Sequence, residues 1–149
     1  MAAMTKERLK SYIHIKKKAD NQEERLIRMR SEEQFPALRM GDGSKRNPGA
    51  SDRMANAVIR RMTYEEKISA SLDECYAEMG AIEDAIEALP DALEQEVLRM
   101  RYIDGNGKYG YMPWRDVAID IYGDDDDQHL RAVHRLHGQA LVHIRKGDR

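Results

Sequence analysis

The sequence is poor in the residues from which disulfide scaffolds, membrane spans and large sheet cores are built. It contains a single cysteine, Cys75, so no internal disulfide can form, which is typical of proteins of the reducing cytosol. No run of about 18 apolar residues is present to span a membrane, and the first residues lack the apolar segment of a secretory signal. Aromatic residues make up 6% of the chain, whereas charged residues make up 35%. We therefore expect a cytoplasmic, all-α protein whose helices bury narrow apolar seams.

The chain also lacks the residue sets of common catalytic and metal centres. It has no nucleophile–base set and no glycine-rich phosphate loop, so we expect neither an enzyme nor a cofactor. His134 and His137 lie one helical turn apart, but no cysteine is near them and His137 falls beside an apolar stripe, so no metal is expected there. The segment DGNGKYG resembles the start of a calcium loop, but Lys108 and Arg115 occupy positions that require oxygen ligands. We therefore expect a binding protein.

Two apolar seams predict a helical hairpin or coiled coil over residues 1–89. The first seam, within Thr5–Met29, alternates three- and four-residue steps through Tyr12, Ile15, Ala19, Gln22, Leu26 and Met29. A second helix is expected from Ser51 or Asp52 to Leu89, and its seam runs through Ile68, Leu72, Cys75, Met79, Ile82, Ile86 and Leu89. Between them a loop is expected over residues of about 30–50, because the stretch Phe35–Ala50 is rich in glycine and proline. A seam this long needs a partner. The first helix, folded back antiparallel, can cover much of it, and a second chain could cover the rest, so we expect a homo-oligomer formed through the long helix.

Residues 90–149 carry three shorter amphipathic segments. The first is PDALEQEVLRMRYIDG, in which Pro90 suits a helix start and the expected apolar stripe is Leu93, Val97 and Met100. The second is PWRDVAIDIYG, with Pro113 suited to the first helical position and a stripe of Trp114, Val117, Ala118, Ile121 and Tyr122. Gly123 is a natural helix end.

The last segment is expected to begin at Asp126 or Asp127, since an aspartate side chain can cap free amides at a helix start. Its apolar stripe is Leu130, Val133, Leu136, Ala140 and Ile144. Three short helices with a turn of about four residues between the last two match the pattern of a helix-turn-helix domain over residues 90–149.

The opposite face of the last segment carries side chains suited to reading DNA bases, namely Gln128, Arg131, His134 and Arg135. Arginine can donate two hydrogen bonds to guanine, and glutamine can pair with adenine in the major groove. Arg115 and Lys146 are candidates for contacts with backbone phosphates. The alternative is a plain solvated helix face, because helix pairs of this kind also occur in folds that never contact DNA.

The end of the chain, RAVHRLHGQAL, resembles the second helix of the helix-turn-helix in sigma-factor region 4. Together with SDRMANAVIRRMTYEEKISASLDE, VLRMRYIDG and PWRDVA, in this order, it resembles more closely the small phage transcription regulators of the RinA/ArpU kind. The resemblance covers about 100 residues and implies an N-terminal helical region followed by a sigma-region-4-like reader. It implies a phage or prophage transcription regulator that binds DNA, RNA polymerase or both.

The sequence departs from that family in two places. NGKYGYMP is inserted before Trp114, and the turn is GDDDDQ, which places four carboxylates at Asp124–Asp127 where phosphates would approach. Like charges repel there, and protein–DNA affinity comes largely from cations that replace counterions. These acids therefore weigh against strong autonomous DNA binding, and they keep open an interaction module that docks on RNA polymerase. A phage packaging protein of the small-terminase type is a second alternative.

The small net charge of −2 conceals an uneven distribution along the chain. Residues 1–50 hold 12 Lys and Arg against 7 Asp and Glu, residues 51–90 hold 4 against 9, and residues 91–149 hold 9 against 11. DNA-binding domains are usually basic, so the N-terminal third, with its cluster at Lys16–Lys18, is the better electrostatic candidate for a polyanion. Alternatively, the basic and acidic helical regions attract each other.

Overall fold

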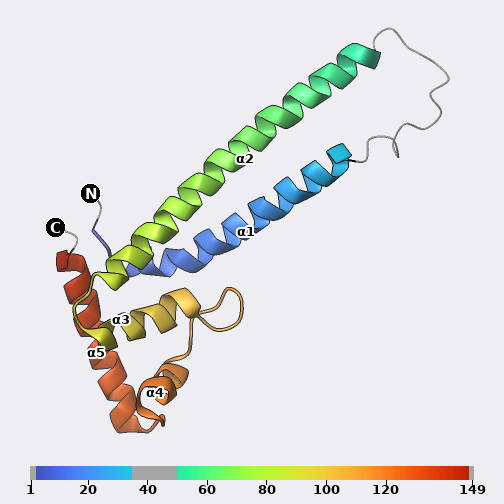
Figure 1. The fold of residues 1–149 in the computed structure, drawn as a ribbon. Helices are drawn as coiled ribbons and strands as arrows, with labels where there is room; N and C mark the ends of the chain where they lie inside the picture. Colours follow the sequence, from blue (N-terminus) through green and yellow to red (C-terminus); the bar gives the residue numbers. More distant parts are fainter. Residues whose placement is uncertain (1–2, 35–49, 148–149) are drawn as a thin grey trace. The chain divides into compact units, whose positions relative to one another are not determined.

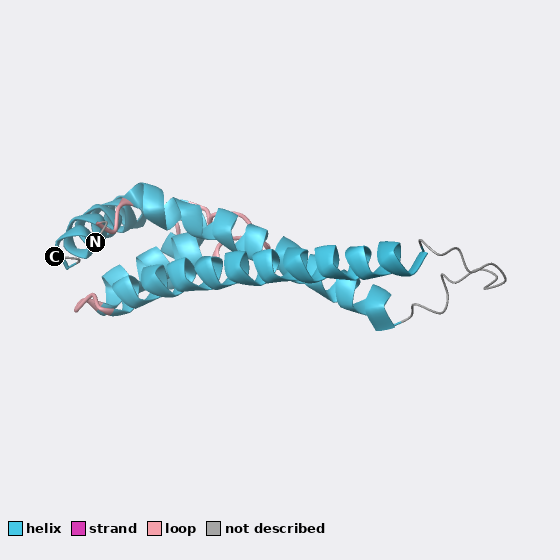
Figure 2. Cartoon of the chain, turned by 90° about the horizontal axis from the view of Figure 1, so that it is seen from above, coloured by secondary structure: helices cyan, strands magenta, loops and turns pink. Residues whose placement is uncertain are grey.

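The computed structural model describes residues 3–34 and 50–147. Within these ranges all of the named secondary-structure elements are helices (Figures 1 and 2). The expected all-α class is therefore confirmed for these residues. The elements are α1 (Lys6–Gln34), α2 (Ala50–Glu87), α3 (Ala92–Leu98), the π-helical turn η2 (Arg99–Asp104), α4 (Trp114–Tyr122) and α5 (Asp127–Gly147). No helix in the described ranges has the length and apolar character needed to cross a membrane.

Helix α1 ends at Gln34, five residues beyond the last residue of the first seam, so residues 30–34 are helical and do not belong to the expected loop. Residues 35–49 of that loop lie outside the described residues. The chain divides into two compact units. The large unit contains the described residues up to Lys17 and from Tyr76 onward, and the hairpin unit is Lys18–Cys75. Each unit holds a part of α1 and a part of α2.

The large unit has two buried apolar clusters. The first joins the beginning of the chain to α2, α3, η2 and α5, through Met4, Leu9, Tyr12, Ile82, Ile86, Leu89, Leu98, Tyr102, Ala140 and Ile144. The second joins α3, α4 and α5, through Val97, Val117, Ala118 and Val133. The seam residues Tyr12, Ile82, Ile86 and Leu89 are thus buried as their spacing predicted. Burial of apolar surface on both sides of α3 fixes the three C-terminal helices to the first turns of α1 and the last turns of α2.

Helix α3 differs from its predicted form at its start and on its buried face. It begins at Ala92 rather than Pro90, because the Asp91 side chain accepts a hydrogen bond from the Leu93 amide at 2.9 Å and caps the helix. The prediction that Leu93 belongs to the apolar stripe is wrong, since this residue is 43% exposed. Glu94 is buried instead, and both its carboxylate oxygens lie within 2.9 Å of Nδ1 of His143 on α5.

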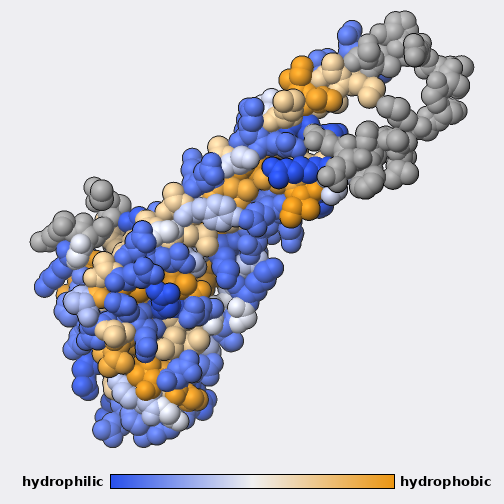
Figure 3. Space-filling model, viewed as in Figure 1, coloured by the Kyte–Doolittle hydropathy of each residue, from blue (hydrophilic) through white to orange (hydrophobic). Residues whose placement is uncertain are grey.

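The hairpin unit has one narrow seam and an exposed apolar end. The seam residues Ala19, Leu26, Ile68, Leu72 and Cys75 are buried, which confirms the three- and four-residue spacing in this part of both helices. Within this seam, the Gln22 side-chain amide donates a hydrogen bond to Ser71 Oγ at 2.9 Å. Towards the start of α2 the large side chains of five residues are exposed: Met54, Val58, Ile59, Met62 and Tyr64. Figure 3 shows apolar surface in this part of the hairpin unit.

Candidate nucleic-acid interface

Helices α4 and α5 are joined by a turn of four residues, as the sequence predicted. Gly123 ends α4 with a left-handed backbone (φ 88°), in which its amide donates to the Ile119 carbonyl at 2.8 Å. Asp126 then caps α5, because its Oδ1 accepts a hydrogen bond from the His129 amide at 2.8 Å. The cap and the glycine together fix the direction in which α5 leaves the turn.

Helix α5 has a buried face and a polar face along its length. Val133, His137, Ala140 and Ile144 are buried against α3, α4 and the rest of the large unit. The four predicted base-reading residues, Gln128, Arg131, His134 and Arg135, are all exposed. A helix anchored on one side with free arginine and glutamine side chains on the other is geometrically able to lie in a groove of DNA.

The structure brings only part of the predicted site together. Gln128, Arg131 and Arg135 lie within two turns at the beginning of α5. Lys146 is in the last turn of the same helix, roughly 27 Å along the axis from Gln128 at 1.5 Å per residue. Arg115 is in the first turn of α4, and its Nε lies 3.0 Å from Asp125 Oδ2. Arg115 is therefore engaged with the acidic turn.

His134 is held in place by aromatic contacts that the sequence did not indicate. The centroid of its ring lies 4.9 Å from that of Trp114. On the same tryptophan ring, the Arg101 guanidinium carbon lies 4.3 Å from the ring centroid, and Arg101 Nη1 donates to the Met112 carbonyl at 2.6 Å. This stack connects η2, the segment before α4, and α5, so Trp114 is packed at the edge of the core rather than inside it.

His137, one turn further along α5, serves the core. Its Nε2 lies 2.7 Å from the hydroxyl of the buried Tyr102. Burial of the imidazole, together with the positive charges of Lys6 and Arg101, lowers the pKa of His137 to about 4. The ring is therefore neutral at neutral pH, and in the tautomer with its proton on Nδ1 it can accept the tyrosine hydroxyl hydrogen. This agrees with the prediction that His137 falls beside the apolar stripe.

The acidic turn Asp124–Asp127 is organised by local contacts. Asp124 Oδ1 accepts hydrogen bonds from the Asp126 amide at 3.2 Å and pairs with Nδ1 of His129, whose ring stacks on Tyr122 with centroids 4.8 Å apart. The hydrogen bond to His129 lowers the pKa of the Asp124 carboxyl, and the same contact raises the pKa of the His129 imidazole. With Arg115 on Asp125, the turn is thus partly neutralised.

Sequence reasoning missed His129, although its spacing of five residues from Asp124 was visible. Asp124, Asp126 and His129 also bring potential metal-ligand atoms within 4.8 Å of one another. These atoms are occupied by the contacts within the turn and by the cap of α5, so the arrangement has a sufficient structural role without a metal.

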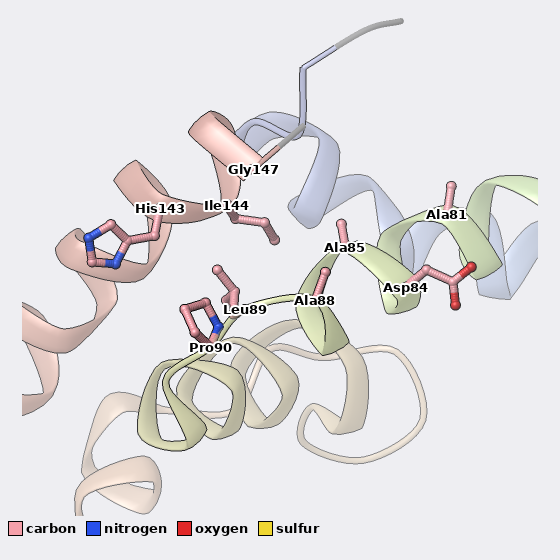
Figure 4. Close-up of a pocket in the computed structure, with 9 residues that line it drawn as sticks. All are labelled: Ala81, Asp84, Ala85, Ala88, Leu89, Pro90, His143, Ile144 and Gly147. Carbon is pink, nitrogen blue, oxygen red and sulfur yellow. The ribbon is translucent and has the colours of Figure 1, made fainter. Parts of the chain in front are cut away.

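A hollow of about 320 Å³ lies between the last turns of α2 and of α5. Figure 4 shows Asp84 and His143 on opposite sides of a lining made mainly of Ala81, Ala85, Ala88, Leu89 and Ile144. Nδ1 of His143 is committed to Glu94, and the lining holds no nucleophile. The lining of this hollow therefore favours contact with a small apolar group.

Comparison of the chain with protein-family models, with curated proteins and with solved structures finds no match. Its function is therefore inferred from the faces, charges and contacts of the large unit and from the exposed end of α2.

Proposed function

We propose that the protein is a DNA-binding transcription regulator of the phage or prophage type, with α4 and α5 acting as a sigma-region-4-like helix-turn-helix. The observation that carries this proposal is the polar face of α5. Arg131 and Arg135 are exposed one turn apart near the beginning of a helix whose other face is buried. Residues near the beginning of a recognition helix are those that contact base edges.

In this proposal Arg131 and Arg135 donate bidentate hydrogen bonds to guanines, and Gln128 contacts a base one turn before them. His134 has less freedom, because its ring packs against Trp114. It would therefore set the position of the helix in the groove. Arg115 would contact a phosphate only after leaving Asp125, and Lys146 would reach backbone at the far end of α5.

The acidic turn favours a second candidate, an interaction module that docks on RNA polymerase without binding DNA by itself. Asp127 lies in the first turn of α5, and Asp124 and Asp125 precede it. These carboxylates repel phosphates, so a partner that delivers the reader to its site would compensate for weak autonomous affinity.

The exposed apolar end of α2 supports self-association, with a second copy of the chain as the occupant. Steps of three and four residues back from Ile68 pass through the charged Glu65 and Arg61 and then reach Val58 and Met54, which are exposed in a single chain. A second copy presents the same stripe, so two such stripes can bury each other, as in a coiled coil. A dimer suits a regulator, whereas a ring of many subunits in light scattering would favour the packaging protein.

The test is equilibrium binding of the full chain to duplex DNA from the region upstream of its own gene, with and without RNA polymerase. We expect specific binding in at least one condition, and loss of it in an Arg131→Ala/Arg135→Ala variant that melts like the wild type. Binding in neither condition, or equal binding by the variant, would remove the DNA-reading function. Capture of polymerase without DNA binding would favour the interaction module.

A further inference from the structure

We propose that Lys10, Lys17 and Lys108 form a second phosphate-binding surface, here called the lysine surface, which supplies the positive charge that the α4–α5 reader lacks. All three side chains are exposed and belong to the large unit, the same compact unit as the reader. The proposal rests on the proposed DNA-binding function and adds to it a contact with the DNA backbone outside the recognition helix.

The lysine surface is assembled by the loop between η2 and α4. This loop is closed by a hydrogen bond from the Asn106 amide to the Gly110 carbonyl at 2.9 Å. Gly105 has φ 65°, and a Cβ there would lie 2.2 Å from the Gly110 carbonyl oxygen, so the closed form requires glycine at this position. The loop therefore has a defined shape in spite of its three glycines.

The closed loop is fixed against α1. The Tyr111 hydroxyl donates a hydrogen bond to the Lys10 carbonyl at 2.9 Å. Next to it, the ammonium group of Lys17 lies 5.9 Å from the centroid of the Tyr109 ring, and that of Lys108 lies 5.5 Å from the same centroid. Cations at this distance are attracted to the face of an aromatic ring, so one tyrosine gathers two lysines from segments far apart in the sequence.

Lys10, the third lysine of the surface, lies on the same exposed face of α1 as Lys17. Lys10 and Lys17 are seven residues apart, which is two helical turns, and His14 lies between them on the same face. All three lysine side chains, with their ammonium groups, belong to residues exposed to solvent. The charge of the lysine surface is therefore available to an external anion.

A nucleic-acid backbone fits this surface better than a small anion. The two lysines on α1 are separated by roughly 10 Å along the helix, which is too far for both to bind one small anion and suits two different phosphates of a nucleic-acid backbone. Residues 91–149, which contain the reader, carry 9 Lys and Arg against 11 Asp and Glu. Because affinity for DNA comes largely from cations that displace counterions, lysines elsewhere in the unit must compensate for this deficit.

The test is the salt dependence of DNA binding by the full chain, measured by fluorescence anisotropy on the upstream duplex and on a scrambled duplex. In Lys10→Gln/Lys17→Gln/Lys108→Gln, the slope of log affinity against log salt should become shallower by about 2 to 3, since each lost phosphate contact removes about 0.9. The ratio of specific to scrambled affinity should stay as in the wild type. The matching Lys→Arg triple variant should keep the wild-type slope.

A control of equal charge change is Arg53→Gln/Arg60→Gln/Lys67→Gln, whose three side chains are exposed on α2 in the hairpin unit. An unchanged slope in the lysine triple variant, or an equal change in this control, would overturn the lysine surface while leaving base reading by α5 intact. If the wild type binds both duplexes equally and the salt slope of the lysine triple variant is shallower as expected, the lysine surface is supported and base reading by α5 is rejected. If the wild type binds neither duplex, both proposals fail.

Discussion

Isoleucines in different parts of α2 have opposite surroundings. Ile82 and Ile86 are 0% exposed in the large unit, whereas Ile59, in the hairpin unit, is 60% exposed. The same residue type in the same helix is thus a core residue in one region and a surface residue in the other. The large unit therefore contains the partners of its own apolar seam, whereas the start of α2 presents apolar surface that a second chain can bury.

The largest expected effect is a loss of stability when a charge is placed in the buried part of the α2 seam. The same change at the exposed start of α2 is the comparison. Ile82→Asp buries a carboxylate in the core and should cost several kcal/mol of unfolding free energy, because no partner compensates its desolvation. Val58→Asp should change the melting temperature of the single chain little, yet lower the mass of any oligomer. Thermal melting and light scattering measure the two effects. Equal loss of stability in both variants would contradict the conclusion that α2 is buried at Ile82 and exposed at Val58.

Acid should destabilise the large unit through His137. The folded-state pKa of His137 is about 4, below the ordinary value near 6.5, so between these pH values the unfolded chain binds the proton more readily. Unfolding free energy should therefore fall as the pH drops through this window, by up to about 3 kcal/mol at about 1.4 kcal/mol per pKa unit. Urea titrations at several pH values measure this loss.

His137→Gln is the control for the acid prediction, because glutamine can still accept a hydrogen bond from Tyr102 but does not titrate. The variant should lose less stability than the wild type between pH 6.5 and 4. If both proteins lose the same amount, other groups determine the acid response and His137 does not.

A smaller effect, on DNA affinity, is expected when negative charge is removed from the acidic turn. Asp125→Asn/Asp127→Asn removes two negative charges and frees Arg115 from its ion pair, while Asp126 continues to cap α5. DNA binding should tighten severalfold at low salt, and the gain should shrink as salt screens the remaining charges. The matched control is Asp73→Asn/Glu74→Gln on the exposed surface of α2, which should leave DNA affinity nearly unchanged.

The smallest expected effect is a pH dependence of DNA binding through His129. Its pKa is raised by the hydrogen bond with Asp124, so the imidazole holds its proton to a higher pH than an ordinary histidine. As the pH rises through this value, the turn becomes more negative and affinity for DNA should decrease. His129→Gln should bind with a flatter pH profile, and an unchanged profile would exclude the histidine as its cause.

Periodicity and end signals predicted much of the fold. The seams of α1 and α2, the stripe of α4, the four-residue turn and the cap of α5 all follow from spacing and from residues such as Gly123 and Asp126, whose local chemistry decides their conformation. The predicted reading face of α5 is exposed for the same reason, since it lies opposite a buried stripe.

Contacts between distant segments could not be predicted in this way. Leu93 was expected to be buried, but it is exposed. Glu94 is buried in its place, with His143, 49 residues later, against its carboxylate. The π-helical turn η2 places Tyr102 against His137, and the closed glycine loop places Tyr109 near Lys17. Each of these depends on tertiary packing, which overrides local preference and leaves no periodic signal.

The proposed reading of bases by Arg131 and Arg135 is tested by the ratio of affinities for the preferred and a scrambled duplex in Arg131→Lys/Arg135→Lys. Lysine keeps the charge but lacks the planar guanidinium fork that fixes two hydrogen bonds to one guanine, a contact worth roughly 1–3 kcal/mol for each guanine. We predict that the ratio falls tenfold or more while affinity for the scrambled duplex is retained, and that Arg53→Lys/Arg60→Lys leaves the ratio unchanged. An unchanged ratio in the α5 variant would contradict the account.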